Sequence, residues 1–240
     1  MPGKYYVEGE HRSDRVEDLF AAVAPRYDLI NDLQSLGLHR LWKRRLVALA
    51  DLKAQEQVLD VCCGTGDVAF ALESTGAQVT GLDFSEPMLS VARQRQSQRG
   101  SSQVRFLQGD ALRLPFPDHS FDVVTISYGL RNLSDFHAGL SELSRVLKPG
   151  GRLLVLDFGK PDLGIWRFFY FQYLRWVVPV FGWLFCGDSD THGYILDSLR
   201  RYPAQRGVDE ALKTMGYSQT RVLHLLGGIM GINWARKAGC

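Results

Sequence analysis

Two closely spaced glycines follow an apolar run in the sequence, and their type and spacing indicate a ligand-binding turn. The run Val58–Val61 is followed by Gly64 and Gly66, and a helical pattern begins at Asp67. Glycine lets the backbone approach a ligand without an intervening Cβ, and the first turn of a helix offers N–H groups that the helix itself leaves unused. This strand, turn and helix predict the floor of a site for a nucleotide-like cofactor.

Acidic residues at the ends of the next two strands narrow the choice of cofactor. Asp83 closes the second apolar run and Asp110 follows the third. A carboxylate after the second strand can accept hydrogen bonds from both hydroxyls of a ribose, as in dinucleotide folds. NAD is disfavoured, because Ala69 replaces the third glycine of G-x-G-x-x-G and the Asp67 and Asp110 charges would repel a pyrophosphate. An adenosine ligand with a cationic centre and no phosphate, S-adenosylmethionine, suits this acidic rim better.

From residue 57 the sequence predicts strands and helices in alternation, and these elements must position the glycines and acidic residues. Alternating strands and helices predict an α/β fold with a parallel sheet and helices on both faces, and ligands of such sheets bind beyond the carboxyl ends of the strands. Two closing strands are expected to be antiparallel. The expected strands are 57–61, 78–83, 104–107, 121–127, 152–157, 222–226 and 231–235, and the expected helices between them include 67–75, 86–98, 135–147, 194–201 and 207–215.

The chain before this core is expected to be helical. Ser13 can cap a first helix that ends before Pro25, and a second helix is expected over 39–52. The pair either forms a cap over the site or packs on the sheet as a plain helical pair, and the sequence favours neither.

The segment 163–186 differs from the rest of the chain in its wealth of aromatic residues. Arg167 and Arg175 fall about 80° apart on a helical wheel, and Pro179 interrupts the helix. A membrane span needs about 20 mostly uncharged apolar residues, so a span is disfavoured. A lid that lines an apolar pocket, or a helix lying against a bilayer, fits better, and a helix buried in the core is the alternative.

Composition and charge exclude several classes of protein. The 240 residues carry a formal net charge of +2 and scattered basic side chains, which offer no groove for nucleic acid. Cys62, Cys63, Cys186 and Cys240 have neither disulfide nor metal-ligand spacing, so we expect no metal site and a reduced, cytoplasmic compartment. The N-terminus shows no apolar core of a signal peptide.

Short motifs between residues 20 and 160 resemble one family of class I S-adenosylmethionine methyltransferases, the ubiquinone/menaquinone biosynthesis C-methyltransferases. The more specific motifs are those before the core and the one after the fourth strand, whereas 114–118 and 148–151 match many methyltransferases. The matching stretches are Arg26-Tyr27-Asp28 with Asn31-Asp32, 37–43, 60–67, 83–85 with Met88-Leu89, 114–118, Phe121-Asp122, 127–132 and 145–151.

The resemblance implies a doubly wound, mostly parallel seven-stranded Rossmann-like sheet with an N-terminal helical cap and an inserted aromatic helical lid. It implies one domain over 1–240, divided into the cap 1–52, the cofactor-binding core 53–160, the lid 161–205 and the closing helix and strands 206–240. The implied cofactor contacts are Asp60, Gly64, Thr65, Gly66, Asp83, Phe84, Asp110, Ala111 and Ser127.

The implied reaction is C-methylation of a prenylated quinol, either demethylmenaquinol or the equivalent ubiquinone or phylloquinone precursor. A phenol has a pKa near 10, so the site must stabilise a phenolate or supply a base. Arg131 is expected to stabilise the oxyanion, with a structural salt bridge as the alternative; Tyr27 or Asp110 is expected to relay the proton. Tyr27 packing in the cap is the alternative for that residue.

Other acceptors and partners stay open at this stage. A methyltransferase acting on a sterol or another phenol would share the cofactor motifs, and a non-catalytic cofactor-binding protein would share the glycines. The segment 163–186 is the expected site of peripheral contact with the inner face of a membrane, and a homodimer is left open.

Overall fold

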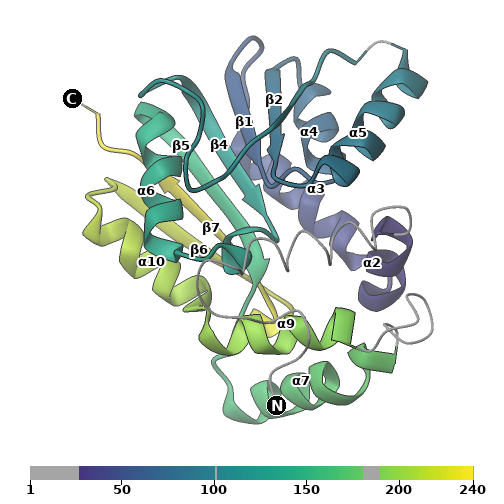
Figure 1. Cartoon of the computed structure of the whole chain (residues 1–240). Helices are drawn as coiled ribbons and strands as arrows, with labels where there is room; N and C mark the ends of the chain where they lie inside the picture. Colours follow the sequence, from purple (N-terminus) through teal and green to yellow (C-terminus); the bar gives the residue numbers. More distant parts are fainter. Residues whose placement is uncertain (1–26, 101, 181–189, 240) are drawn as a thin grey trace.

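The computed structural model describes residues 27–100, 102–180 and 190–239 (Figure 1). Its centre is a seven-stranded sheet of order β3-β2-β1-β4-β5-β7-β6. Strands β1 to β5 run parallel, and β7 is antiparallel to both of its neighbours. The parallel sheet and the antiparallel closing pair predicted from the sequence are therefore confirmed.

The strands lie close to their expected positions. The strand β5 begins five residues earlier than expected, because the chain re-enters the sheet at Leu147 and bulges over the stretch that contains Gly150 before pairing resumes at Arg152. Gly150 has φ +75°, the left-handed conformation that favours glycine. The bounds are β1 Gln57–Val61, β2 Gln78–Asp83, β3 Arg105–Gln108, β4 Phe121–Ser127, β5 Leu147–Phe158, β6 Gln219–Leu225 and β7 Met230–Arg236.

Helices cover both faces of the sheet, as expected. The helix predicted from Ser13 lies outside the described residues, while α2 begins in a stretch for which the sequence suggested no element. The bounds are α2 Tyr27–Ser35, α3 Leu38–Ala50, α4 Asp67–Glu73, α5 Glu86–Arg99, α6 Phe136–Val146, α7 Gly164–Trp176, α9 Asp190–Arg201 and α10 Ala204–Thr214, with short 3-10 turns η2 Leu130–Asn132 and η3 Leu226–Gly228.

Two apolar cores result, one on each face of the sheet. Leu59 and Val61 of β1 face the core under α6, α9 and α10, whereas Val58 faces the core under α3, α4 and α5 (Figure 1). Parallel strands buried on both faces need near-continuous apolar sequence, which β1 and β4 have. A polar side chain inside such a strand, such as Asp60, therefore has a reason other than packing.

Helix α7 lies on the surface beyond the ends of β4 and β5 (Figure 1). Tyr170 and Leu174 are its buried residues, while Ile165, Phe169 and Trp176 are each more than half exposed. The alternative of a helix buried in the core is therefore wrong for 164–176. Within the described ranges, every helix is too short or too polar to cross a bilayer.

Leucines of α3 provide a matched test of this packing. Leu46 is fully buried, whereas Leu41 in the same helix is 59% exposed. We expect Leu46→Ala to lower the free energy of unfolding by about 2–5 kcal/mol, because it removes buried surface and leaves a cavity. Leu41→Ala should change it by less than about 0.5 kcal/mol. Urea unfolding followed by circular dichroism measures both, and equal losses would contradict the position of α3.

Candidate functional site

The candidate site lies where the order of the strands reverses around β1. Strand β1 pairs with β2 on one side and β4 on the other, and Val61 is level with both Leu82 and Ile126. The residues that follow these three strands therefore meet at one edge of the sheet. In open α/β sheets this reversal point is where ligands bind.

The turn after β1 presents open backbone at this edge. Gly64 and Gly66 have φ +52° and +86°, in the left-handed region. A Cβ added at Gly64 would meet no atom within 4 Å, so the space before it is open to a ligand. A Cβ added at Gly66 would lie 2.8 Å from the Phe70 ring, so this glycine is also required by the packing of α4.

Asp83 ties the end of β2 to this turn. Its Oδ2 accepts a hydrogen bond from the Gly64 amide at 2.7 Å, and its Oδ1 accepts one from the Ser85 amide at 2.9 Å. Burial raises the pKa of Asp83, and these amide donors oppose that shift. The Ser85 side chain makes no capping bond to α5 within the described chain, and its Oγ is buried. Phe84 between them is 40% exposed beside the turn.

Asp60 lies one layer beneath the turn. Its Oδ1 accepts a hydrogen bond from Thr125 Oγ1 at 2.7 Å, and its Oδ2 has no partner among the described residues. Burial raises the pKa of Asp60 to about 7, with a further contribution from the Asp83 charge and opposition from Thr125 and Lys43. The side chain can therefore exchange a proton near neutral pH, although its 1% exposure keeps it from bulk water.

Three more of the expected cofactor residues lie after β3 or at the last position of β4. Asp110 is exposed, and its Oδ1 accepts a hydrogen bond from the Leu112 amide at 2.9 Å. Ala111 is buried, and the Oγ of Ser127 is buried with no partner in the described part of the chain. A hydroxyl in this state at the reversal point has hydrogen-bonding capacity for a ligand.

These groups fit the chemistry of S-adenosylmethionine. A fixed carboxylate at Asp83, an open glycine backbone at Gly64 and a buried hydroxyl at Ser127 supply acceptors and donors for a ribose and an amino acid group. Asp67 does not add to the acidic rim as expected, because it pairs with Lys43 and Arg95 at 3.1 Å each. Burial opposes ionisation of Asp67, but the neighbouring Lys43 and Arg95 charges outweigh it and lower its pKa.

Helices α2 and α3 are tied to the turn by ion pairs that the sequence did not reveal. Arg95 of α5 pairs with Asp28 of α2, and its Nη1 also reaches Asp67 at 3.1 Å. Thr65 Oγ1 lies 3.3 Å from Asp28 Oδ1. Asp28 belongs to one of the motifs identified in the sequence, whereas Arg95 lies inside α5, a mostly polar helix on which an arginine usually faces solvent. The partner could be found only by folding the chain.

The Tyr27 side chain lies outside the described residues, and the structure places only its backbone at the start of α2. His39 lies at the start of α3. Its Nδ1 is 3.1 Å from Ser35 Oγ, and its Nε2 is 3.6 Å from Asp32 Oδ1. Burial lowers the pKa of His39, aided by the charge of Lys43. His39 thus joins α2 to α3.

Arg131 lies in a buried ion pair. It follows β4 in η2, and its Nη1 donates to Asp157 Oδ1 at 2.8 Å and to the Tyr128 carbonyl at 2.5 Å. The side chains of Arg131 and Asp157 are 6% and 3% exposed. The salt bridge considered from the sequence is therefore present, and the guanidinium charge is shared with Asp157 before any substrate binds.

The adjacent cysteines pack against two glycines, Gly81 in β2 and Gly129 after the end of β4. A Cβ added at Gly129 would lie 2.5 Å from Cys62 Cβ, and one added at Gly81 would lie 3.0 Å from Cys63 Sγ. Burial raises the pKa of both thiols well above the usual range, and nearby carboxylates add to the shift. Neither thiol is then a nucleophile at neutral pH. Across the described ranges, no cluster of three or more His, Cys, Asp or Glu side chains is placed to hold a metal ion.

The chain is similar in sequence to known methyltransferases. The sequence model of the ubiE/COQ5 methyltransferase family matches residues 8–237. A demethylmenaquinone methyltransferase of Thermus thermophilus is 45% identical over 202 residues, covering 83% of this chain and 91% of that protein. The ubiquinone/menaquinone biosynthesis C-methyltransferase UbiE of Teredinibacter turnerae is 39% identical over 236 residues, covering 97% and 95%.

Solved structures support the fold. A SAM-dependent methyltransferase of Thermotoga maritima, described as a possible histamine N-methyltransferase, aligns with a TM-score of 0.63 at 20% identity over 92% of this chain and 99% of that one. A SAM-dependent methyltransferase of Aquifex aeolicus aligns with a TM-score of 0.58 at 20% identity over 81% and 88%. At these identities the likeness concerns the fold alone.

The buried carboxyl of Asp60 predicts a pH dependence of stability. Its pKa is about 7 in the folded chain and about 3.9 when unfolded, so between these values the folded state binds the extra proton. Raising the pH through this window therefore destabilises the fold. Between pH 5 and pH 7.5 the wild type should lose about 2–3 kcal/mol relative to Asp60→Asn, as measured by urea unfolding at both values.

Thr125→Val provides the matched variant for this measurement. It removes the hydrogen bond that opposes the raised pKa of Asp60, so its loss of stability between the two pH values should exceed that of the wild type. Parallel pH profiles for the wild type and Asp60→Asn would contradict the assignment.

Proposed function

The chain belongs to the ubiE/COQ5 methyltransferase family, a family of S-adenosylmethionine-dependent enzymes, and from this premise we propose that it methylates a ring carbon of a prenylated quinol. The acceptor is demethylmenaquinol or the equivalent ubiquinone precursor. The observation that carries the proposal is the match to a demethylmenaquinone methyltransferase at 45% identity over most of both chains. The open Gly64 backbone between Asp83 and Ser127 supports it.

The proposed cofactor contacts divide by chemistry. When bound, S-adenosylmethionine supplies an electrophilic methyl group on a positively charged sulfur. Asp83 and Phe84 would hold the ribose and the adenine edge, and Asp110 with Ala111 would lie beside the base. The turn Gly64-Thr65-Gly66 and Ser127 would orient the amino acid part, with Asp60 supporting the turn from below. Fixing the donor and the ring carbon together supplies much of the rate in such a transfer.

The acceptor must be reduced and deprotonated for its ring carbon to attack. A quinone ring is poor in electrons, whereas a quinol that loses one hydroxyl proton becomes nucleophilic at the neighbouring carbon. Asp110 is the proposed relay for this proton, because it is exposed at the site edge and can exchange with water. Tyr27, at the start of α2, is the second proposed relay.

The buried ion pair with Asp157 favours a different role for Arg131 than stabilisation of the oxyanion. A guanidinium that already shares its charge with Asp157 at 2.8 Å adds little net charge to stabilise a phenolate. Its bond to the Tyr128 carbonyl and its pair with β5 instead hold the end of β4, which carries Ser127. We therefore assign Arg131 as a positioning residue, while direct contact with the oxyanion stays a prediction from the sequence.

The apolar surface of α7 is proposed to receive the prenyl tail at the face of a membrane. Exposed apolar patches of this kind mark membrane or partner contacts. Tyr173 of α7 donates a hydrogen bond to the Gln34 carbonyl of α2 at 3.0 Å, and α2 in turn contacts the cofactor turn through Asp28. One helix thus separates the proposed tail surface from the methyl donor. The division into cap 1–52, core 53–160, lid 161–205 and closing elements 206–240 is part of this proposal.

The reaction predicts dependence on the redox state of the acceptor. We expect methylation of a short-tailed demethylmenaquinol under anaerobic reducing conditions and no turnover of the oxidised quinone, because only the quinol supplies a nucleophilic carbon. Mass spectrometry detects the product as heavier by one CH2 group. Equal turnover of the quinone under oxidising conditions would contradict this mechanism. Comparable methylation of a sterol or a simple phenol would favour the alternative acceptors.

The positioning role of Arg131 predicts rescue by a second substitution. Arg131→Met leaves the Asp157 charge buried and should cost about 3–5 kcal/mol in the free energy of unfolding. Arg131→Met with Asp157→Asn removes both charges and keeps an acceptor oxygen for one of the two backbone amides, of residues 131 and 158, that donate to Asp157, so a large part of the stability should return. We expect kcat to recover to within about tenfold of wild type, with KM little changed.

An oxyanion contact by Arg131 would give a different result for the double variant. The protein would be stable and bind S-adenosylmethionine in calorimetry, yet kcat would stay about 10²–10³-fold low, as for loss of one oxyanion donor.

A further inference from the structure

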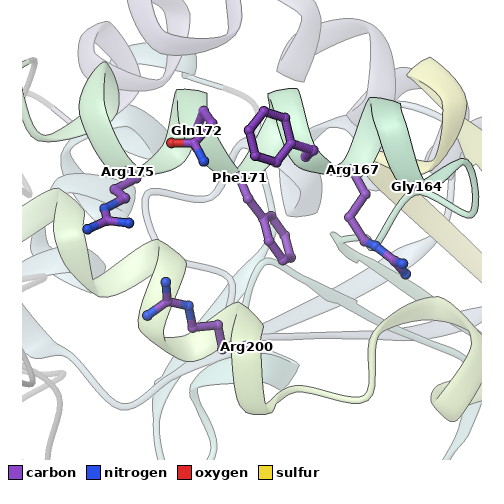
Figure 2. A pocket seen from close by; sticks show the side chains of 7 residues that line it. Gly164, Arg167, Phe171, Gln172, Arg175 and Arg200 are labelled. Atoms are coloured by element: carbon purple, nitrogen blue, oxygen red, sulfur yellow. The ribbon is translucent and has the colours of Figure 1, made fainter.

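A cleft between α7 and α9 has a basic lining that the methyl transfer does not use. Its volume is about 330 Å³. Figure 2 shows Arg167 at one end, with Arg175 and Arg200 toward the other and Phe171 pointing into the space between the helices. The described residues that line it are Gly164, Arg167, Phe168, Phe171, Gln172, Arg175 and Arg200.

The spacing along α7 explains how one helix builds this wall. Gly164, Arg167, Phe171 and Arg175 recur every three or four residues and so share one face of the helix. The exposed apolar residues Ile165, Phe169 and Trp176 lie about a third of a turn farther round. Phe168, which is 58% exposed, lies between the two faces. The basic cleft and the apolar stripe are therefore neighbours on one surface.

The charge in the cleft is positive. The described lining residues include three arginines and no carboxylate. The guanidinium of Arg175 stacks on Trp176 at 5.0 Å, and Arg200 forms a loose pair with Asp197 at 3.7 Å. Guanidinium groups match the geometry of phosphate oxygens and bind them in a forked arrangement. The cleft is thus complementary to an anionic phosphate.

The apolar stripe indicates where that phosphate comes from. A small soluble phosphate would use the arginines alone, whereas a phospholipid at a bilayer surface would also bury the exposed side chains of α7 in the interface. Basic side chains near an anionic membrane surface and apolar side chains within it add their contributions to binding.

We propose that the α7–α9 cleft binds the phosphate group of an anionic phospholipid and so holds the apolar stripe of α7 against the membrane. Arg175 and Arg200 are the principal ligands, and Arg167 supports them. The proposal rests on the proposed function, in which the prenyl tail of the acceptor is drawn from the bilayer beside α7.

Vesicle binding tests this site. Wild-type protein is mixed with vesicles of phosphatidylcholine alone or with about 30% phosphatidylglycerol, and binding is measured by flotation. Arg175→Gln with Arg200→Gln should weaken affinity for the anionic vesicles about 25-fold, at about fivefold for each charge near the surface. The control pair Arg105→Gln with Arg236→Gln removes the same charge from β3 and from the end of β7, and should stay within about twofold of wild type.

Further measurements separate the outcomes. Turnover of a short-tailed demethylquinol without vesicles should be unchanged in Arg175→Gln with Arg200→Gln, which shows that the variant is folded. Equal loss of anionic binding in the test and control pairs would overturn the site, as would submillimolar binding of inorganic phosphate alone in calorimetry. The lipid site and the proposed function can fail independently. If the wild-type protein methylates the quinol but shows no preference for anionic vesicles, the lipid site is overturned and the proposed function stands.

If binding to anionic vesicles is lost only in Arg175→Gln with Arg200→Gln, but the wild-type protein does not methylate the quinol, the lipid site is supported and the proposed function is overturned.

Discussion

The hydrogen bond from the Gly64 amide to the Asp83 carboxylate is the constraint on which the candidate site depends. It joins the turn after β1 to the end of the neighbouring strand β2 at 2.7 Å. Because Gly64 has a left-handed backbone and open space before it, the same bond that fixes the turn also leaves its backbone facing space that is open to a ligand. The acceptor must be a carboxylate placed by the register of the sheet, which pairs Val61 with Leu82 and so brings Asp83 level with the turn.

A second set of contacts connects the turn after β1 to the surface helices. Arg95 and Lys43 pair with carboxylates of α2 and α4, so the helices before the core are held over the turn by charge rather than by apolar packing alone. Such partly exposed pairs contribute modest stability, and their value here is in orientation. Helix α2 then contacts α7 through Tyr173 and Gln34. A continuous path of contacts therefore links the proposed methyl donor site to the exposed aromatic surface where an apolar acceptor would arrive.

Buried charge is concentrated at the ends of β1, β4 and β5. Arg131 and Asp157 form a pair that is nearly inaccessible to water, and Asp60, which accepts a hydrogen bond from Thr125, lies beneath the turn with a raised pKa. Charges in such positions cost desolvation free energy, so a fold retains them where they order backbone or serve a ligand. The Arg131 pair orders the backbone between β4 and β5, whereas Asp60 keeps one carboxylate oxygen without a partner in the described chain.

The sequence by itself determined the elements and the chemistry at their ends. Apolar runs of strand length, helical periodicity between them, paired glycines and acidic residues after strands are local patterns, so they predicted β1 to β7 and placed Gly64, Asp83 and Asp110 at one edge of a sheet. Only the tertiary structure decided which distant charges meet. Arg131 could pair with Asp157 or face a substrate, Asp67 could face a cofactor or pair with Lys43 and Arg95, and the aromatic helix could be buried or exposed. Each of these outcomes depends on packing between elements 24 or more residues apart, or on the face a helix turns to the sheet, and no local pattern of residues encodes it.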